Sequence, residues 1–170
     1  NAAIHRIGEA TEGGVAAPYD GSVAVPAADR PERGRNRGDP ILAALTAPVT
    51  EGFVRYLKGE LQFKTDRAYV LLNGKAARQW SWDDGGDAPG AAQALQKALQ
   101  GNPKLRVVVA AGMTDLVAPY FMNAYVIDHL PREARDRIAL KLYAGGHMMY
   151  LRPGSRAALQ HDARALFPAP

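Results

Sequence analysis

The chain has 170 residues, of which 47% are hydrophobic, and a formal net charge of +4. This length suffices for one domain with a sizeable core. The chain has no cysteine, which excludes a disulfide scaffold, a cysteine-ligated zinc site and a thiol nucleophile. No histidine pair has metal-ligand spacing, and no apolar run reaches the roughly 18 residues of a membrane-spanning helix. We therefore expect neither a bound metal nor a membrane span.

Residues 1–38 are frequently interrupted by Gly and Pro and predict an irregular lead-in segment. Within it, Tyr19-Asp20-Gly21-Ser22 is a turn signal, and Val23–Val25 predicts a short extended piece. Four arginines fall within Arg30–Arg37. Because no aromatic residues are interleaved with them, they favour a solvated loop over a nucleic-acid-binding patch. We therefore expect no nucleic-acid partner.

Two helices are predicted in the middle of the chain. The first covers Ala47–Leu61, where apolar residues recur at helical spacing, with Thr46 as a candidate N-cap and Pro48 in its first turn. The second covers Ala91–Gln100 and ends before a Gly-Asn-Pro sequence. Its predicted inward-facing residues are Leu95 and Leu99.

A hairpin is predicted between these two helices. Ala68–Leu72 and Ala77–Trp82 flank the dipeptide Asn73-Gly74, which is typical of a two-residue hairpin turn. Trp80 and Trp82 alternate at strand spacing, so they would face the same side of the hairpin. Their rings suit either core packing or the lining of a substrate pocket, and the sequence leaves both roles open.

The last third of the chain has a regular pattern of alternating strands and helices. Apolar runs at Arg106–Gly112 and Ile138–Gly146 predict buried strands, each followed by a helix, over Pro119–Leu130 and Ser155–Phe167 respectively. Such a βαβα unit implies two neighbouring parallel strands and the α/β fold class, with Ser155 as the last helix's candidate N-cap. Because a parallel sheet needs covered faces and further strands, the pattern resembles the C-terminal part of a larger α/β domain.

One candidate catalytic residue follows each of these two strands. Asp115 comes after the first strand, and His147 follows the Gly145-Gly146 pair at the end of the second. The carboxyl ends of parallel strands lie on one edge of a sheet, so these side chains should meet there. There is an alternative role for each residue. Asp115 could serve only as a local cap of its turn, and His147 could be a structural histidine in a turn. In the functional interpretation they are the second and third members of a Ser-Asp-His triad.

The nucleophile of such a triad is missing from the chain. No G-x-S-x-G elbow occurs in the sequence, and Ser22, Ser81 and Ser155 lack the strand–elbow–helix context. No glycine-rich phosphate loop is present either. Met148 adjoins His147 and is a candidate substrate contact, although packing is the alternative role. The other histidines are expected to be structural or exposed: His5, His129 and His161.

Two segments resemble the bacterial branch of the serine carboxypeptidase family. Ala110–Pro119 resembles the G-x-x-D-x-x-x-P sequence around the family's catalytic Asp, and Ala144–Tyr150 resembles the A-G-H-M sequence around its catalytic His. The similarity extends upstream to Tyr19-Asp20-Gly21, to Gly59–Asp66 and to the two tryptophans. It therefore spans most of the chain.

This resemblance implies an α/β-hydrolase fold with a helical cap inserted before the last strands. The lead-in segment would cover residues 1–38, the cap or cap-adjacent segment 39–101, and the C-terminal βαβα unit of the core 102–170. It also implies hydrolysis of C-terminal peptide bonds through Asp115 and His147, without metal or cofactor, in a periplasmic or secreted protein. The natural partners would be a peptide substrate and the missing serine-bearing portion or chain.

Two alternatives remain beside the carboxypeptidase. The chain could be a non-enzymatic binding or assembly module derived from this fold, or part of an esterase or acyltransferase on the same scaffold. A truncated parallel sheet exposes an apolar edge, so we expect the isolated chain to form homo-oligomers. Because a triad without its nucleophile cannot form an acyl intermediate, we expect the isolated chain to be inactive.

Overall fold

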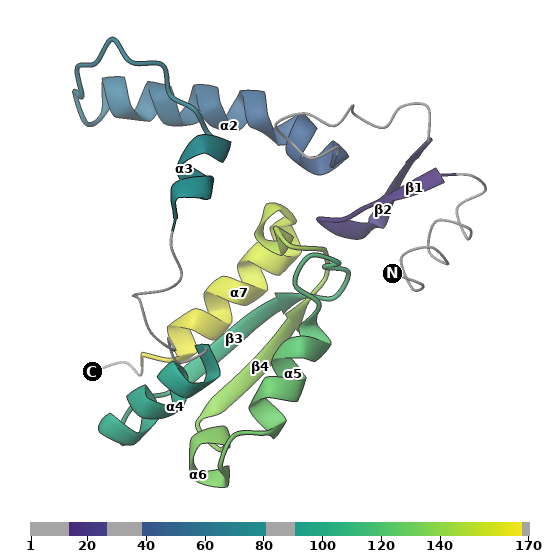
Figure 1. The fold of residues 1–170 in the computed structure, drawn as a ribbon, viewed down its shortest axis with the longest axis vertical. Helices are drawn as coiled ribbons and strands as arrows, with labels where there is room; N and C mark the ends of the chain where they lie inside the picture. Colours follow the sequence, from purple (N-terminus) through teal and green to yellow (C-terminus); the bar gives the residue numbers. More distant parts are fainter. Residues whose placement is uncertain (1–13, 27–38, 81–90, 168–170) are drawn as a thin grey trace. The chain divides into compact units, whose positions relative to one another are not determined.

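The computed structural model describes residues 14–26, 39–80 and 91–167. The described residues form a mixed α/β structure with two small sheets, which confirms the α/β class. In chain order the elements are β1 (Gly14–Ala17), β2 (Asp20–Pro26), α2 (Pro40–Gly59), α3 (Gly74–Gln79), α4 (Ala91–Gly101), β3 (Val107–Gly112), α5 (Tyr120–Asp128), α6 (Arg132–Arg135), β4 (Ile138–Tyr143), η2 (Met149–Leu151) and α7 (Pro153–Ala165) (Figure 1).

These elements divide into two compact units. The sheet unit comprises residues 18–23 and 91–167, and the helical unit comprises residues 14–17, 24–26 and 39–80. The helix α4 therefore belongs to the sheet unit, although it falls inside the segment 39–101 that was predicted as cap or cap-adjacent. None of the described helices is long and apolar enough to cross a membrane.

The described part of the lead-in segment is a hairpin rather than irregular chain. β1 and β2 pair as a two-stranded sheet joined by a turn at Pro18-Tyr19, so of the predicted turn signal only Tyr19 lies in the turn, and Asp20–Ser22 belong to β2. Along β2 the less exposed Val23 and Val25 alternate with exposed residues, which is the period-two pattern of a half-covered strand. The short extended piece predicted at Val23–Val25 is therefore confirmed as part of β2. The arginine-rich segment Arg30–Arg37 lies outside the described residues.

Helix α2 starts earlier than the spacing predicted, at Pro40 instead of Ala47. Its N-cap is Asp39, whose carboxylate accepts hydrogen bonds from the backbone N–H groups of Ile41 and Leu42. Aspartate is a strong N-cap and proline fits the first helical position, so the helix begins there. Thr46 is inside the helix and donates its hydroxyl hydrogen bond to the carbonyl of Leu42.

The predicted hairpin around Asn73-Gly74 is wrong. Residues Gly74–Gln79 form α3, and the Asn73 side chain caps it by accepting hydrogen bonds from the N–H groups of Lys75 and Ala76, both at 3.1 Å. An asparagine can cap a helix as readily as it can form a turn, and here capping prevails. Trp80 follows the helix and is 68% exposed, so core packing is wrong for it; Trp82 lies outside the described residues.

The sheet unit contains the predicted βαβα arrangement. β3 and β4 are parallel, in a register that runs from Val107 opposite Ile138 to Gly112 opposite Tyr143. The connection passes through α5 and α6, and Figure 1 draws α5 and α7 on opposite sides of the two strands.

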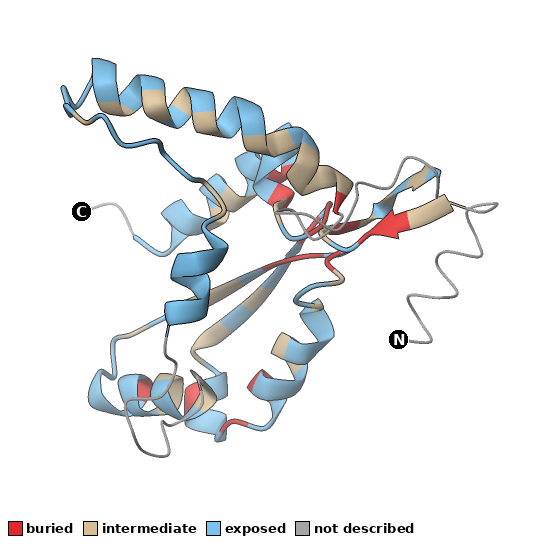
Figure 2. Ribbon diagram, turned by 45° about the horizontal axis from the view of Figure 1, so that its top comes forward, coloured by how far each residue is buried: buried red, intermediate tan, exposed pale blue. Residues whose placement is uncertain are grey.

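Burial of this sheet is confined to the carboxyl ends of its strands. Ala111, Gly112 and Tyr143 are buried, whereas the other residues of β3 and β4 are half-buried or exposed (Figure 2). Fully buried strands were predicted, and the difference arises because β3 and β4 are each other's only partners among the described strands. The strand sequences are those of a larger sheet, as their continuous apolar runs indicate.

A small hydrophobic core lies at the opposite end of the sheet. Leu99 of α4 is fully buried against Leu130 and Ala134, as its predicted inward orientation requires. The half-buried residues around them are Leu95, Leu105, Val107 and Ile138.

Ser155 does not cap α7. It lies inside the helix, which begins at Pro153, and its buried hydroxyl donates a 2.6 Å hydrogen bond to the carbonyl of Ala144. The proline starts the helix because its fixed φ is already helical. Ser155 thus ties α7 to the loop that precedes His147.

Candidate functional site

Two loops meet at the carboxyl end of the β3–β4 sheet, and their backbones are in direct contact. A Cβ built on Gly112 would overlap the carbonyl oxygen of Gly146, and one built on Gly146 would overlap the carbonyl oxygen of Tyr19. Gly145 has a φ of +114°, a conformation that glycine adopts without strain. Three chain segments therefore cross at a place that admits no side chain.

Asp115 is held rigidly on the first of these loops. It is only 7% exposed. Its Oδ1 accepts hydrogen bonds from the N–H groups of Val117 (2.8 Å) and Ala118 (2.9 Å). The capping role considered from the sequence is therefore present, but it uses one carboxylate oxygen and leaves Oδ2 for a second partner.

That partner is His147, on the second loop. Nδ1 of His147 lies 2.9 Å from Oδ2 of Asp115, so the expected meeting of the two side chains is confirmed. The backbone N–H of His147 donates a 2.6 Å hydrogen bond to the carbonyl of Tyr19, and the Tyr19 ring meets the imidazole edge-on, with 4.9 Å between ring centres. The imidazole is thus fixed from two sides.

The other side of the imidazole faces open space. The His147 side chain is 39% exposed, and Nε2 has no hydrogen-bond partner among the described residues. A carboxylate on Nδ1 keeps the proton on that nitrogen and leaves Nε2 as a base. The pair can therefore take a proton from a hydroxyl group placed beside Nε2.

No described serine occupies that position. The hydroxyl of Ser22 is hydrogen-bonded to Asp20 and Arg152, and that of Ser155 to the carbonyl of Ala144. Ser81 lies outside the described residues. The nucleophile absent from the sequence motifs is thus also absent from the described surroundings of His147.

A second buried carboxylate, Asp20, lies beside this pair and was not singled out as functional from the sequence. Its Oδ1 accepts hydrogen bonds from the N–H of Ser22 (3.1 Å), the hydroxyl of Ser22 (2.6 Å) and the hydroxyl of Thr114 (2.6 Å). Its Oδ2 accepts one from Arg152 at 2.9 Å. Two sequence features pointed to this region without giving Asp20 a role: the turn signal at residues 19–22 and the family resemblance at Tyr19-Asp20-Gly21.

The electrostatics of Asp20 favour its charged form. Burial raises the pKa of this carboxyl group, but hydrogen bonds from Ser22, Thr114 and Arg152 outweigh it and lower the pKa to about 2. Asp20 is therefore ionised at neutral pH, which strengthens its hydrogen bonds to donors on three different segments.

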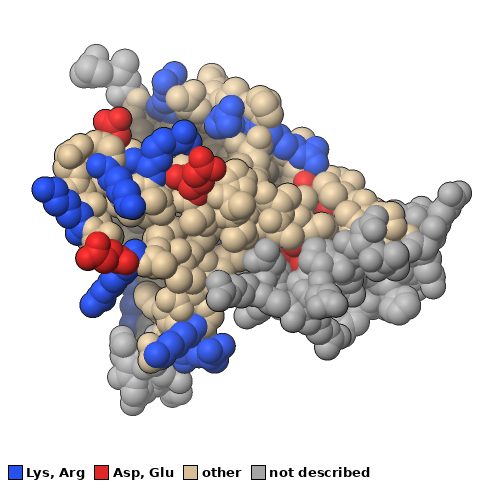
Figure 3. All heavy atoms as spheres, turned by 90° about the horizontal axis from the view of Figure 1, so that it is seen from above, with Lys and Arg blue, Asp and Glu red and all other residues tan. Residues whose placement is uncertain are grey.

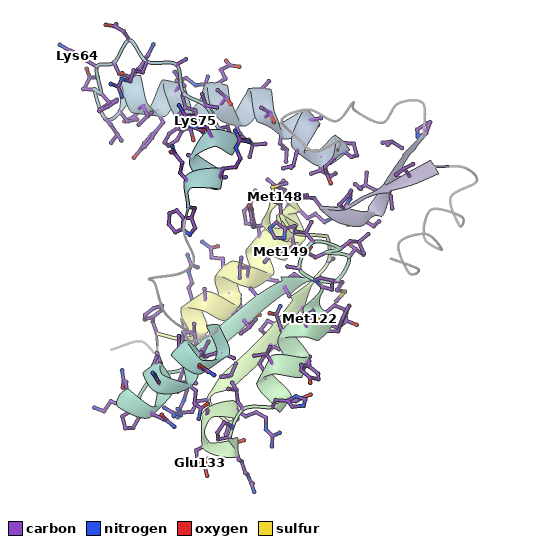
Figure 4. The ribbon with its side chains drawn as sticks, in the orientation of Figure 1. Lys64, Lys75, Met122, Glu133, Met148 and Met149 are labelled. Carbon is purple, nitrogen blue, oxygen red and sulfur yellow. The ribbon has the colours of Figure 1, made fainter. Side chains whose placement is uncertain are left out.

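Met148 is half-buried next to His147, and Met149 is buried at the start of η2. Figure 4 labels both near the beginning of α7. The role of Met148 in substrate binding stays a prediction. His129 lies elsewhere, with its ring stacked on Tyr125 and Nδ1 2.8 Å from that residue's carbonyl oxygen, and His161 is exposed. His5 lies outside the described residues.

The described residues include no cluster that could hold a metal ion, and one groove of the sheet unit is not lined by the pair. Among the described residues, no group of three or more His, Asp or Glu side chains is arranged to hold a metal ion. A groove of about 370 Å³ in the sheet unit is bordered by Tyr143, Arg152 and Ser155, and neither Asp115 nor His147 lines it. On the face shown in Figure 3, basic side chains are spread among uncharged residues, with fewer acidic side chains between them.

Comparison with known proteins adds no relative. No family model matches the chain, and no curated protein or solved structure matches it.

Proposed function

We propose that this chain contributes the Asp and His of a Ser-Asp-His triad in a serine carboxypeptidase-like hydrolase. The observation that carries the proposal is the 2.9 Å hydrogen bond between Asp115 and His147, at the carboxyl ends of adjacent parallel strands. The order Asp then His along the chain is the order of the α/β-hydrolase triad. The serine comes from a further part of the protein or from a separate chain.

In this function His147 is the general base and Asp115 orients it. Nε2 removes the proton of the serine hydroxyl as the oxygen attacks the carbonyl carbon of the C-terminal peptide bond, and the imidazolium then protonates the leaving amine. Asp115 holds the proton on Nδ1 and stabilises the positive charge. Nε2 then takes a proton from a water molecule as the water oxygen attacks the acyl carbon, and the imidazolium returns that proton to the serine oxygen as the acid product leaves. The donors that stabilise the oxyanion belong to the serine-bearing part.

The finer fold in this proposal is an α/β-hydrolase. The parallel β3–β4 pair, the intervening α5 and the closing α7 fit the end of such a core, and α2 and α3 of the helical unit fit its cap. Two features of the sheet unit support the proposal that a further strand pairs with β3 in the complete protein. One long edge of β3 has no partner among the described strands, and its half-buried valines have the composition of an interior strand.

The composition of helix α5 also supports the proposal that a further part of the protein packs against the sheet unit. Apart from Asn123 and Asp128 its residues are apolar and are not confined to one face, a pattern typical of a buried helix, yet most of them are exposed. Met122 projects from α5 in Figure 4. The exposed apolar residues on this helix are Tyr120, Phe121, Met122, Tyr125 and Val126. The serine-bearing part would cover this face and pair with the free edge of β3.

The second candidate function, an assembly module without catalysis, rests on the same exposed helix. In that case a second copy of the chain covers α5, and the Asp115–His147 pair is only structural. The two functions differ in one observable property. The carboxypeptidase requires a reactive serine in the complete protein, whereas the module does not.

The test compares the 170-residue chain with the protein purified from its source cell. We expect the chain alone to leave an N-blocked dipeptide intact, and the native protein to cleave it and to be labelled by a serine-directed phosphonate. In the native protein, His147→Ala should lower kcat/KM by about 10³-fold or more. His129→Ala is the matched control and should leave kcat/KM unchanged.

Two results would contradict the proposal. One is hydrolysis by the chain alone that is lost in His147→Ala, which would place a nucleophile within these residues. The other is a native protein that carries no phosphonate-reactive serine, which would favour the assembly module. A comparison of ester with peptide substrates on the native protein separates a carboxypeptidase from an esterase.

A further inference from the structure

Both loops of the Asp115–His147 pair are attached to one short segment, Pro18–Ser22, which comprises the β1–β2 turn and the first residues of β2. The N–H of Gly21 donates to the carbonyl of Thr114 (2.7 Å), and the N–H of Leu116 donates to the carbonyl of Pro18 (3.1 Å), so these bonds fall on either side of Asp115. The N–H of His147 donates to the carbonyl of Tyr19. This segment is thus hydrogen-bonded to the backbone of the first loop on both sides of Asp115, and to the backbone of the second loop at His147 itself.

The carboxylate of Asp20 fixes the same two loops through their side chains. It accepts a hydrogen bond from Thr114, the neighbour of Asp115, and another from Arg152, which follows the His147 loop and η2. The side chain of Arg152 also lies over Gly145, because a Cβ built there would come within 2.9 Å of its Nε. A single charged group is therefore bonded to the first loop and to the end of the second.

We propose that Asp20 is a positioning residue for the Asp115–His147 pair, which it holds at hydrogen-bonding distance by joining the Thr114 loop to Arg152. The inference deepens the proposed function, since a triad acts only when its imidazole is held in the required tautomer and orientation. Asp20 does not touch the imidazole. It acts through the two loops, and a carboxylate that served stability alone would not change the state of His147.

The test reads the tautomer of His147 by NMR in the full 170-residue chain labelled with ¹⁵N. The chemical shifts of Nδ1 and Nε2, measured with the imidazole neutral and assigned with His147→Gln, give the ratio of the Nδ1–H to the Nε2–H form. Asp115→Asn supplies the reference for a pair that has lost its charged acceptor. In Asp20→Asn we expect the ratio to fall at least about threefold towards that reference.

Asp162→Asn is the matched control. Asp162 is also a carboxylate of the sheet unit, it accepts a hydrogen bond from the buried Tyr143, and it bonds to neither loop of the pair. This substitution should leave the His147 ratio unchanged. If Asp20→Asn does not fold, the His147 ratio is measured in Thr114→Val instead. This substitution removes only the 2.6 Å hydrogen bond from Thr114 to Asp20 and keeps the Asp20–Arg152 ion pair.

A folded Asp20→Asn chain, or a folded Thr114→Val chain in its place, with the wild-type ratio would overturn the inference. The readout needs neither a serine nor peptidase activity. A shifted ratio in a native protein that lacks a reactive serine would therefore contradict only the proposed function, and an unshifted ratio in an active native protein would contradict only the role of Asp20.

Discussion

The backbone of Gly112 lies so close to that of Gly146 that a methyl group on Gly112 would overlap the Gly146 carbonyl oxygen. The obstacle is backbone, which cannot turn aside as a flexible side chain can. Gly112→Ala should therefore destabilise the sheet unit by about 3 kcal/mol or more. Gly154→Ala is the control, because nothing lies within 4 Å of a Cβ built there. Thermal unfolding by circular dichroism measures both, and a Gly112→Ala melting temperature equal to that of Gly154→Ala would contradict the close approach.

Substitutions at Asp115 separate its two tasks. Asp115→Ala removes the acceptor of the Val117 and Ala118 N–H groups and should cost about 1–2 kcal/mol of stability. Asp115→Asn keeps an acceptor for these groups and loses the charge that faces His147, so it should remain close to wild type in urea unfolding. Equal losses in the two variants would show that the turn does not depend on the Oδ1 hydrogen bonds.

The stability of the sheet unit should depend on pH through Asp20. Its pKa of about 2 in the folded chain lies below the ordinary value of 3.8, so its contribution is present above about pH 4 and is lost as the pH falls towards 2. A shift of this size corresponds to about 2 kcal/mol. Urea unfolding at pH 5 and at pH 2 should show a smaller loss for Asp20→Asn than for wild type, and identical losses would contradict the prediction.

Tyr143 should titrate late. Burial and the hydrogen bond to Asp162 raise its pKa to about 12, so its contribution to stability persists up to about pH 10 and is lost as the pH rises through 12. Near-ultraviolet absorbance of tyrosinate, with Tyr143→Phe as the difference standard, follows this ionisation. Asp162→Asn should bring it to lower pH, and an unchanged titration would exclude the Tyr143–Asp162 interaction.

Self-association of the isolated chain should depend on α5. Phe121 is 59% exposed and Met122 is 54% exposed, and contiguous apolar surface of this kind favours association. We expect light scattering to give a mass above 18.3 kDa for wild type and a lower mass for Phe121→Lys. Val49→Lys, which changes an exposed apolar residue on α2, is the control. A monodisperse monomer for wild type would contradict the expectation.

The sequence by itself determined the βαβα order of the sheet unit and the convergence of Asp115 with His147. Apolar strand runs and helical spacing are local patterns, and parallel strands bring their carboxyl ends to one edge whatever surrounds them. The inward orientation of Leu99 followed from the same periodicity. The start of α2 and the identity of α3 did not follow, because Asp39 and Asn73 carry side chains that suit caps and turns equally.

Only the tertiary structure showed that the carboxylate of Asp20 is hydrogen-bonded to both loops that carry Asp115 and His147. Asp20 is 94 residues from Thr114 along the chain and 132 from Arg152, and no local pattern reports hydrogen bonds over such separations. The close approach of Gly112 to Gly146 is likewise set by how two loops cross. The incomplete burial of β3 and the exposure of α5 were decided in the same way. An apolar run indicates that a segment favours burial, but it does not indicate whether a partner is present to cover it.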